Sequence, residues 1–520
     1  MQLKKTSLIV LALLALTTGI CVLSVSCGNS EKKIAETDGQ GLSKKYCVSC
    51  HKYPEPALLD QDTWAKHVLP AMAPHLGIKV YAEDQYVNNP SSNSGLGYED
   101  WLKIVEYYKS AAPKKLKPAT VPIAPLKDWA GFKLNMPNET KATPATTTMV
   151  AFDTISHQLF TGDRATNRVY MWSDKLKLRS ATGHNSPAVD VQFGKDKRGE
   201  EYGSFTFIGS MDAVDVSNGS VVDIPLKKFG SAENLIADKL PRPVQSLSAD
   251  FDKDGLEDRI VCGFGHNFGG LFLYKQVSGN QYRKSTISSI PGAEQAVIGD
   301  FNKDGWPDIA CLFAQADEGI WMFLNDHQGG FTTKNLLRFP PVYGSTSFQL
   351  IDFNNDGKLD ILYTCGDNGD FSRVLKPYHG VYIFLNQGDL KFKQTWFYPV
   401  NGATKAIAAD FNGDGKPDIA SIAFFSDLKD TPDEGFTYFE QDAGMQFIPH
   451  RLPINTFGRW ICTDVKDINS DGRPDIILGN YALGFINENG LKPTWNIHTP
   501  FVVLENEKAK LAAKESKNSK

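Results

Sequence analysis

The stretch Asp410-Phe411-Asn412-Gly413-Asp414-Gly415-Lys416-Pro417-Asp418 decides the fold, because copies of it space out most of the chain. The five copies begin at Asp250, Asp300, Asp352, Asp410 and Asp467, at steps of 50, 52, 58 and 57 residues. Each copy has the form Asp-x-(Asp/Asn)-x-Asp-Gly-x-x-Asp and runs directly into an apolar stretch. Oxygen ligands at its first, third, fifth and ninth positions suit a hard cation, with Ca²⁺ as the natural candidate. Glycine at the sixth position lets the loop reverse sharply around the ion.

An EF-hand is the obvious alternative for such a loop. An EF-hand loop needs Glu at position 12 and a helix after it. In the five copies that position holds Val261, Cys311, Tyr363, Ser421 and Leu478. Because a strand-like run follows each loop where a helix should begin, the sequence excludes an EF-hand.

A second recurring pattern gives the number of repeat units. An apolar strand that closes in a polar turn starts at Val169, Val214, Leu271, Trp321, Val381, Phe436 and Phe501. Units of about 45 to 60 residues with short strands and Gly turns are typical of a β-propeller with four-stranded blades. We therefore predict seven blades over residues 148–507. The first two blades would carry degenerate loops, near Phe152-Asp153 and Asp190-Val191.

The Asp loops and their following strands resemble the FG-GAP/VCBS repeats of integrin α-subunits and of many secreted bacterial proteins. The resemblance implies a propeller stabilised by up to five Ca²⁺ ions. It says little about activity, because such propellers serve adhesion, sugar binding and several kinds of enzyme. The implied calcium ligands are Asp250, Asp252, Asp254 and Asp258; Asp300, Asn302, Asp304 and Asp308; Asp352, Asn354, Asp356 and Asp360; Asp410, Asn412, Asp414 and Asp418; and Asp467, Asn469, Asp471 and Asp475.

Each predicted blade also has a polar break after the strand that follows its loop. The breaks are Gly162-Asp163-Arg164, Ser210-Met211-Asp212, His266-Asn267, Gln315-Ala316-Asp317-Glu318, Asp367-Asn368 (followed by Arg373, Tyr378 and His379), Ser426-Asp427 and Asn480-Tyr481. Equivalent loops of a propeller share one face and converge on its axis, so these residues could ring a common pocket. Ordinary turn chemistry is the alternative, since Asp, Asn and Gly favour turns.

Residues 1–26 have the features of an export signal, with Lys4 and Lys5 ahead of an apolar core over residues 8–20. The end of this segment, up to Cys27, resembles a bacterial lipoprotein signal, although Ser24 stands where Leu is usual. That resemblance implies lipid modification of Cys27 and a tether over residues 27–40. An uncleaved membrane helix is the alternative, because about 20 residues can span a bilayer. Both interpretations place the rest of the chain outside the cytoplasm, and we expect a periplasmic or surface lipoprotein of the cell envelope.

The motif Cys47-Val48-Ser49-Cys50-His51 is the strongest chemical signal in the chain. CxxCH is typical of c-type haem attachment, in which two thiols form thioethers and the adjacent imidazole binds iron. A zinc site would want a second ligand pair nearby, and a thioredoxin-like motif would want a βαβ context. Neither is present. Export favours haem, because c-type haem is attached outside the cytoplasm.

The sixth iron ligand should come from the same small domain. Met72 is the one methionine between residues 31 and 120, and a thioether ligand suits electron transfer because it leaves no open position. We therefore predict Met72, with His75 and His67 as alternatives that would give bis-histidine ligation. Packing in the core is the non-functional interpretation of Met72.

The helical spacing of Trp101, Ile104, Val105, Tyr107 and Tyr108 resembles the C-terminal helix of a class I cytochrome c. We therefore predict a small all-α cytochrome domain over residues 41–113, of the kind fused to propellers in exported bacterial proteins. The Pro-rich residues 114–147 predict a stiff linker, and residues 508–520 a charged tail.

Composition narrows the function of this multidomain protein. A net charge of −5 over 520 residues offers no basic footprint for nucleic acid, and neither HExxH nor GxSxG occurs. Cys262, Cys311, Cys365 and Cys462 fit buried apolar positions. We expect a cytochrome that exchanges single electrons with a protein partner docked on the propeller. Two alternatives stay open: a redox enzyme with substrate on the polar face, and a calcium-dependent adhesion or carbohydrate-binding protein.

Overall fold

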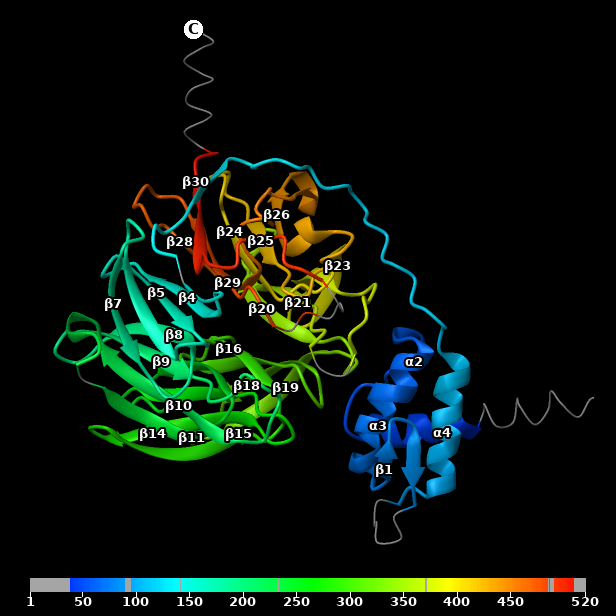
Figure 1. The fold of residues 1–520 in the computed structure, drawn as a ribbon. Coiled ribbons are helices and arrows are strands. Elements are labelled where there is room, and N and C mark those ends of the chain that lie inside the picture. The colour runs from blue at the N-terminus through cyan, green and yellow to red at the C-terminus, as the bar shows by residue number, and fades with distance from the viewer. Residues whose placement is uncertain are drawn as a thin grey trace, which may run out of the picture.

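The computed structural model describes residues 38–88, 95–140, 142–231, 233–369, 372–484, 486 and 491–508. The predicted export signal, the predicted lipidation site Cys27 and nearly all of the predicted charged tail lie outside these residues. The described chain forms a small helical domain and a β-propeller of seven four-stranded sheets, as predicted (Figure 1). Among the described residues, no helix is both long and apolar enough to cross a membrane.

The helical domain has a short hairpin in addition to its helices. Residues 38–46 are helical and are followed by the single turns η1 (Cys47–Ser49) and η2 (Pro56–Leu58). One continuous helical run then comprises α2 (Gln61–Thr63), η3 (Trp64–Val68), α3 (Leu69–Met72) and η4 (Ala73–Leu76). The hairpin β1 (Lys79–Ala82) and β2 (Gln85–Val87) precedes α4 (Tyr98–Ala111). The domain is therefore mainly helical rather than all-α.

The core of the helical domain forms where α4 meets the continuous helical run. Trp101, Ile104, Val105 and Tyr108 recur at helical spacing on one face of α4 and are buried. The Tyr108 ring lies 4.5 Å from the Trp64 ring, centroid to centroid. The predicted helical stripe of α4 is thus a packed face.

Seven antiparallel meanders make up the propeller, and their first four blades follow one another along the chain. Blade 1 contains β4 (Thr147–Asp153), β5 (Gln158–Asp163), β6 (Arg168–Ser173) and β7 (Leu178–Gly183). Blade 2 contains β8 (Ala188–Lys195), β9 (Glu201–Phe207), β10 (Ser217–Pro225) and β11 (Asn234–Pro241). Blade 3 contains β12 (Pro243–Ala249), β13 (Asp258–Gly263), β14 (Gly270–Ser278) and β15 (Gln281–Ser288). Blade 4 contains β16 (Ala293–Gly299), β17 (Asp308–Phe313), β18 (Gly319–Asn325) and β19 (Phe331–Arg338).

The last three blades continue this order until the final sheet. Blade 5 contains β20 (Ser345–Ile351), β21 (Asp360–Cys365), β22 (Gly380–Asn386) and β23 (Phe392–Pro399). Blade 6 contains β24 (Lys405–Ala409), β25 (Asp418–Ile422), β26 (Phe436–Gln441) and β27 (Phe447–His450). Blade 7 contains β28 (Trp460–Lys466), β29 (Asp475–Asn480) and β30 (Phe501–Asn506), and its fourth strand is β3 (Phe132–Asn135). The ring therefore closes by a strand that precedes the first blade in sequence.

Strand β3 lies within the segment predicted to be a linker. It pairs antiparallel with β30, with Phe132 opposite Asn506. Upstream of β3, the Tyr398 hydroxyl donates to the Ile123 carbonyl at 2.9 Å, and Leu126 pairs with His450 of blade 6. The segment therefore contacts blade 5 and then blade 6 before it enters blade 7 (Figure 1).

The meander places the Asp loops and the polar breaks on opposite faces of the propeller. The five Asp loops join the first and second strands of blades 3 to 7, and the polar breaks join the second and third strands. Successive connections of a meander alternate between its two ends, so all the breaks share one face, here called the polar face. In blade 2 two positions differ from the prediction, because the third strand begins at Ser217 and Asp190 lies inside β8.

Side chains of the innermost strands link neighbouring blades around the axis. The side-chain oxygen of Gln245 accepts from the Ala296 N–H at 2.7 Å, and Gln349 accepts from the Ala408 N–H at the same distance. The second strands are almost entirely buried, and the thiols of Cys262, Cys311 and Cys365 are unpaired and enclosed there. Cys462, on an innermost strand, is unpaired and half-buried.

Candidate functional site

The Asp loops are compact turns held by their first carboxylate. In the blade 4 loop, Asp300 accepts from the Asp304 N–H at 3.0 Å and from the Gly305 N–H at 2.9 Å. The same two bonds recur in the loops that begin at Asp250, Asp352, Asp410 and Asp467. The glycine of each loop has a positive φ, for example 84° at Gly305, as the sequence predicted from its permissive backbone.

The ninth aspartate of each loop has a structural role. In blade 4, Asp308 accepts from the Phe301 N–H at 3.0 Å and from the Asn325 N–H at 2.8 Å, so it ties the loop to the third strand. All five ninth-position carboxylates are at most 1% exposed. Burial raises the pKa of Asp418 and of Asp475 to about 6. These residues fix the loop even if they also bind an ion.

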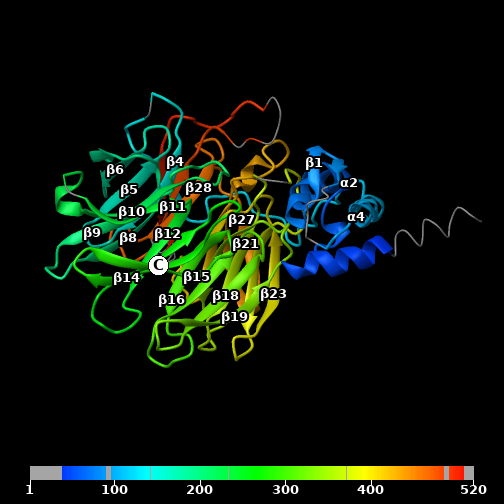
Figure 2. The same cartoon turned by 90° about the horizontal axis from the view of Figure 1, so that it is seen from below.

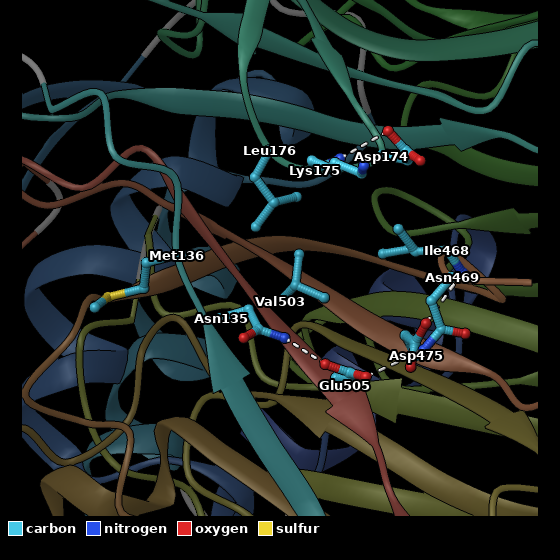
Figure 3. Close-up of a pocket in the computed structure, with 10 residues that line it drawn as sticks. All are labelled: Asn135, Met136, Asp174, Lys175, Leu176, Ile468, Asn469, Asp475, Val503 and Glu505. Carbon is cyan, nitrogen blue, oxygen red and sulfur yellow. Dashed lines mark hydrogen bonds between the residues drawn. The ribbon is translucent and has the colours of Figure 1, made fainter. Parts of the chain in front are cut away.

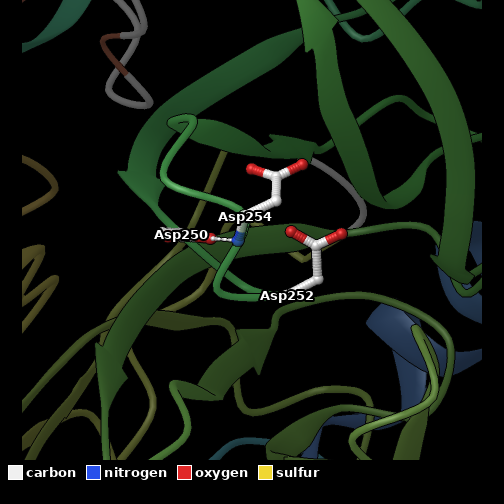
Figure 4. Close-up of side chains that lie close together, drawn as sticks. All are labelled: Asp250, Asp252 and Asp254. Atoms are coloured by element: carbon white, nitrogen blue, oxygen red, sulfur yellow. Dashed lines mark hydrogen bonds between the residues drawn. The ribbon is translucent and has the colours of Figure 1, made fainter.

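The carboxylates that gather most closely are Asp250, Asp252 and Asp254. Their candidate ligand oxygens lie within 4.8 Å of one another, and no other His, Cys, Asp or Glu group of the described chain does this (Figure 4). The other four loops carry Asn at the third position, so each has one carboxylate fewer. Carboxylate and amide oxygens on a tight turn are a donor set that fits Ca²⁺.

Each Asp loop also contacts a cationic or imidazole side chain. Lys275 forms an ion pair with Asp252, and the other four loops form the pairs His327–Asp304, Lys358–Asp356, Lys416–Asp414 and Arg473–Asp471. These partners partly neutralise the carboxylates. Lys358, Lys416 and Arg473 directly follow the loop glycine, so this partner could have been found from the repeated sequence, whereas Lys275 and His327 come from outside the nine-residue loop.

The CxxCH motif has the chemistry that c-type haem attachment requires. Cys47 and Cys50 are unpaired thiols, and burial raises the pKa of Cys47 to about 11. The Nδ1 atom of His51 lies 3.0 Å from the Lys52 carbonyl, which can only accept, so Nδ1 carries the proton and the Nε2 lone pair is left for a metal. Burial lowers the pKa of His51, which favours the neutral imidazole.

The candidates for the sixth ligand differ in environment. Met72 ends α3 and is partly buried against the domain core, whereas His67 and His75 are exposed. Two buried donors of that core, Trp101 Nε1 and Tyr86 Oη, have no hydrogen-bond partner in the described part of the chain. The two thiols, the neutral imidazole and the thioether are a donor set that fits c-type haem.

The helical domain contacts the polar face of the propeller next to its CxxCH motif. Lys52 Nζ donates to the Arg338 carbonyl at 3.0 Å, and the Tyr378 hydroxyl donates to the Leu58 carbonyl at 3.1 Å. Val342 and Val374 pack against the helical domain's core. Arg338 ends β19 of blade 4, and the other three propeller residues lie in connections of blades 4 and 5 on the polar face. Both views show the domain beside blade 5 (Figures 1 and 2).

Asp317 belongs to the polar break of blade 4 and lies near the CxxCH motif of the helical domain. It forms an ion pair with Arg338, the residue whose carbonyl binds Lys52. The charges of Asp317 and Arg338 act in opposite directions on the pKa of His51, after the larger effect of burial. A polar break of the propeller therefore lies beside the CxxCH histidine.

The other polar breaks meet one another in part. Arg164 donates to the Tyr481 hydroxyl at 2.7 Å and to Asp212 at 3.3 Å, which joins the breaks of blades 7, 1 and 2. In contrast, Asp427 accepts from the Asp430 N–H at 3.0 Å inside its own turn. The breaks of blades 7, 1 and 2 are therefore in direct contact, whereas the Asp427 break of blade 6 forms a local turn.

Two residues of the predicted polar breaks, Glu318 and His379, join Lys376 in a cluster of buried ionisable side chains behind the domain contact. Glu318, Lys376 and His379 are each at most 1% exposed. Burial raises the pKa of Glu318 to about 8 and lowers that of Lys376 to about 8. Within the described chain, Glu318 Oε2 and both ring nitrogens of His379 lack a hydrogen bond. Sequence analysis missed Lys376, because charged residues are almost always exposed and no sequence pattern marks a buried one.

Two clefts lie on the face that carries the Asp loops. One, of about 290 Å³, lies where blade 7 meets blade 1, and there Asn135 Nδ2 donates to Glu505 at 2.8 Å (Figure 3). Leu176, Ile468 and Val503 line it with apolar surface. The other, of about 580 Å³, lies between blades 3 and 4.

Comparison with known proteins identifies the repeats. Residues 250–311, 300–363 and 371–421 match the FG-GAP-like repeat. The chain is 25% identical to integrin alpha-3 of Cricetulus griseus over 181 residues, which are 31% of this chain and 17% of that protein. It is 27% identical to the T-cell immunomodulatory protein homolog of Plasmodium falciparum (isolate 3D7) over 132 residues, 24% of this chain and 18% of that protein. The chain thus spans less than a fifth of the length of these relatives.

Solved structures are similar in fold alone. The β-propeller domain of Cps50 (Swd1) from Myceliophteria thermophila shares 9% identity with a TM-score of 0.42, over 72% of this chain and 99% of that one. Periplasmic gluconolactonase of Pseudomonas aeruginosa shares 12% identity with a TM-score of 0.38, over 59% of this chain and 85% of that one. The integrin-like FG-GAP repeats support a ligand-binding or docking module for the propeller.

Proposed function

We propose that this protein is an exported c-type cytochrome that transfers single electrons, with its propeller as a docking module stabilised by calcium. The observation that carries the proposal is the contact between the CxxCH segment and the polar face of blades 4 and 5, through Lys52–Arg338 and Tyr378–Leu58. The CxxCH motif, which suits haem attachment, thereby lies against the propeller, which suits docking of a partner.

In this proposal each residue of the motif has a defined role. Cys47 and Cys50 hold the porphyrin, and His51 and Met72 hold the iron, which supplies one-electron redox chemistry when haem is bound. The Lys52 carbonyl fixes the tautomer of His51, and Asp317 with Arg338 sets the charge beside it. Calcium at the Asp loops would stabilise blades 3 to 7. A lipid on Cys27 would hold the protein to a membrane of the cell envelope.

Covalent haem is the first test of the proposal. The protein is produced in the periplasm of a host that attaches c-type haem, and haem is assayed as the pyridine haemochrome after denaturation. We expect one covalent haem per chain, and none in the Cys47→Ala, Cys50→Ala double variant. The matched control, Cys365→Ala, alters a buried thiol of the propeller and should keep the haem. Wild-type protein that retains no haem after denaturation would refute the proposal.

A second candidate function is a redox enzyme with its substrate on the polar face. It is favoured by Glu318 and His379, because unpaired buried acid and base atoms lie behind the domain contact. Such groups are common at sites of proton transfer. The haem-loaded protein, without any partner, should then be reduced by its substrate, and Glu318→Gln should slow this step. Absence of reduction across a panel of sugars and alcohols would favour the electron carrier.

A further inference from the structure

The larger cleft, here called the blade 3–4 groove, has the size and lining of a ligand site. Its volume of about 580 Å³ falls in the range of roughly 300 to 1,000 Å³ that is typical of small-molecule sites. Outer strands β14 and β15 form one wall, and connections of blade 4 form the other, with Trp306, His327 and Phe331. The Trp306 and His327 rings are stacked at 4.8 Å between centroids, and Lys253 lies over the Trp306 ring at 4.4 Å, so these contacts hold the aromatic side chains of this wall in place.

Two cations lie side by side on the first wall. Lys275 of β14 is directly opposite Arg283 of β15, so both side chains point to the same face of the sheet. Like charges in such positions repel each other. Asp252 neutralises Lys275 through an ion pair, whereas the Arg283 guanidinium has no ion pair or hydrogen bond within the part of the chain that the structure describes. The wall can therefore accept an anion.

The same lysine connects the groove to an Asp loop. Lys275 Nζ is paired with Asp252 and lies 3.9 Å from Asp254, two of the three carboxylates that gather in that loop. One oxygen of Asp252 is buried and without a partner. Oxygen atoms bind Ca²⁺ at about 2.3–2.6 Å, so an ammonium group bonded to the same carboxylates would be repelled by the ion. Binding of a cation in this loop therefore requires Lys275 to leave it.

We propose that the blade 3–4 groove binds an acidic oligosaccharide, and that cation binding in the Asp250–Asp254 loop strengthens this binding by releasing Lys275. Once released, Lys275 and Arg283 together offer two cations for carboxylates of the ligand. The aromatic atoms of Trp306, His327 and Phe331 on the opposite wall can pack against the C–H groups of a sugar. The inference rests on the proposed calcium site, and it concerns the face opposite the one that contacts the helical domain.

Lys358 provides a matched comparison within the chain. It pairs with Asp356 of the blade 5 loop at 2.9 Å, as Lys275 pairs with Asp252, but it lines neither of the two clefts. Replacing it removes an equivalent loop cation without changing the groove.

The test is isothermal titration calorimetry of the full chain with trigalacturonic acid, in calcium and in chelator. We expect the affinity to be about tenfold higher in calcium, a typical coupling between two sites. Lys275→Ala should lose that gain while it binds calcium more tightly, because the competing ammonium is gone. The double variant Asp252→Asn, Asp254→Asn should bind the trisaccharide tightly without calcium, because nothing retains Lys275. Lys358→Ala should behave as the wild type, and neutral galactotriose should bind at least tenfold more weakly.

Each contrary result has a distinct meaning. Calcium that binds without changing the affinity for trigalacturonic acid overturns this inference alone, as does a double variant that is folded by its melting curve and still needs calcium. Equal loss of affinity in Lys358→Ala and Lys275→Ala also overturns it, since general charge would then explain the binding. If calcium neither binds nor shifts the melting temperature, the proposed calcium sites fail together with the inference.

Discussion

Closure of the propeller through β3 predicts that Phe132→Ala destabilises the whole ring. The Phe132 side chain is 4% exposed and packs edge-on against two rings, Phe411 at 5.9 Å and Tyr438 at 5.2 Å between centroids. Truncating a buried Phe to Ala lowers the free energy of unfolding by about 3–5 kcal/mol. Each of the two aromatic contacts contributes about 0.5–1.5 kcal/mol to this loss, in addition to the contribution of the buried apolar area. We expect the change to lie near the upper end, because β3 joins the two ends of the ring.

Urea unfolding, followed by tryptophan fluorescence, measures this effect. The matched control is Trp129→Ala, which lies three residues away in the same segment but is 39% exposed, and we expect a change below about 1 kcal/mol there. Phe132→Leu keeps most of the buried volume and should give an intermediate loss. If Phe132→Ala changed the unfolding free energy by less than about 1 kcal/mol, β3 would not close the ring in solution, and the segment would be a simple linker.

Three further predictions concern the ligands and the buried histidine. Met72→Ala should abolish the far-red absorption band of methionine bound to iron(III) while covalent haem persists, and a wild type without that band would favour His75 or His67. Chelation of calcium should lower the melting temperature of the propeller, because a free calcium concentration of 100 times the Kd stabilises the fold by about 2.7 kcal/mol per site. An unchanged melting temperature would mean that the loops bind no calcium. Burial holds the pKa of His379 well below 6.5. Below pH 6.5 the imidazole is therefore protonated in the unfolded chain but not in the folded one. The free energy of unfolding should then fall by up to about 1.4 kcal/mol for each unit by which the pH is lowered. His379→Phe should show a weaker loss between pH 7.5 and 5.0 in urea midpoints, and an identical loss would contradict this.

The repeated features of the fold could be predicted from sequence because each blade repeats them locally. The Asp loop is set by nine consecutive residues, so its glycine and its carboxylates identify the turn wherever it occurs. Counting those loops and the third strands gave seven blades, and the structure has seven. The prediction was least accurate in blade 2, which has no intact Asp loop. There the third strand was predicted to begin at Val214, whereas it begins at Ser217.

The features that sequence analysis missed depend on contacts between distant parts of the chain. Phe132 pairs with Asn506 across more than 370 residues, and nothing in residues 132–135 distinguishes an outer strand from an extended linker. The contact of Lys52 with Arg338 is equally non-local. Burial of Lys376 is stabilised by Asn368, at 2.5 Å, and by carbonyl groups, none of which forms a recognisable motif.

The two faces of the propeller therefore divide the proposed roles. The helical domain occupies the polar face at blades 4 and 5, through Tyr378 and Arg338, whereas the Asp loops and the blade 3–4 groove lie on the opposite face. A ligand in the groove would not displace the helical domain, because the two sites share no residue. In the proposed function, an acidic polysaccharide would hold the protein in place while a haem iron held by His51 and Met72 exchanges electrons. If so, Lys275→Ala should weaken retention on the polysaccharide and leave the reduction potential of the haem unchanged.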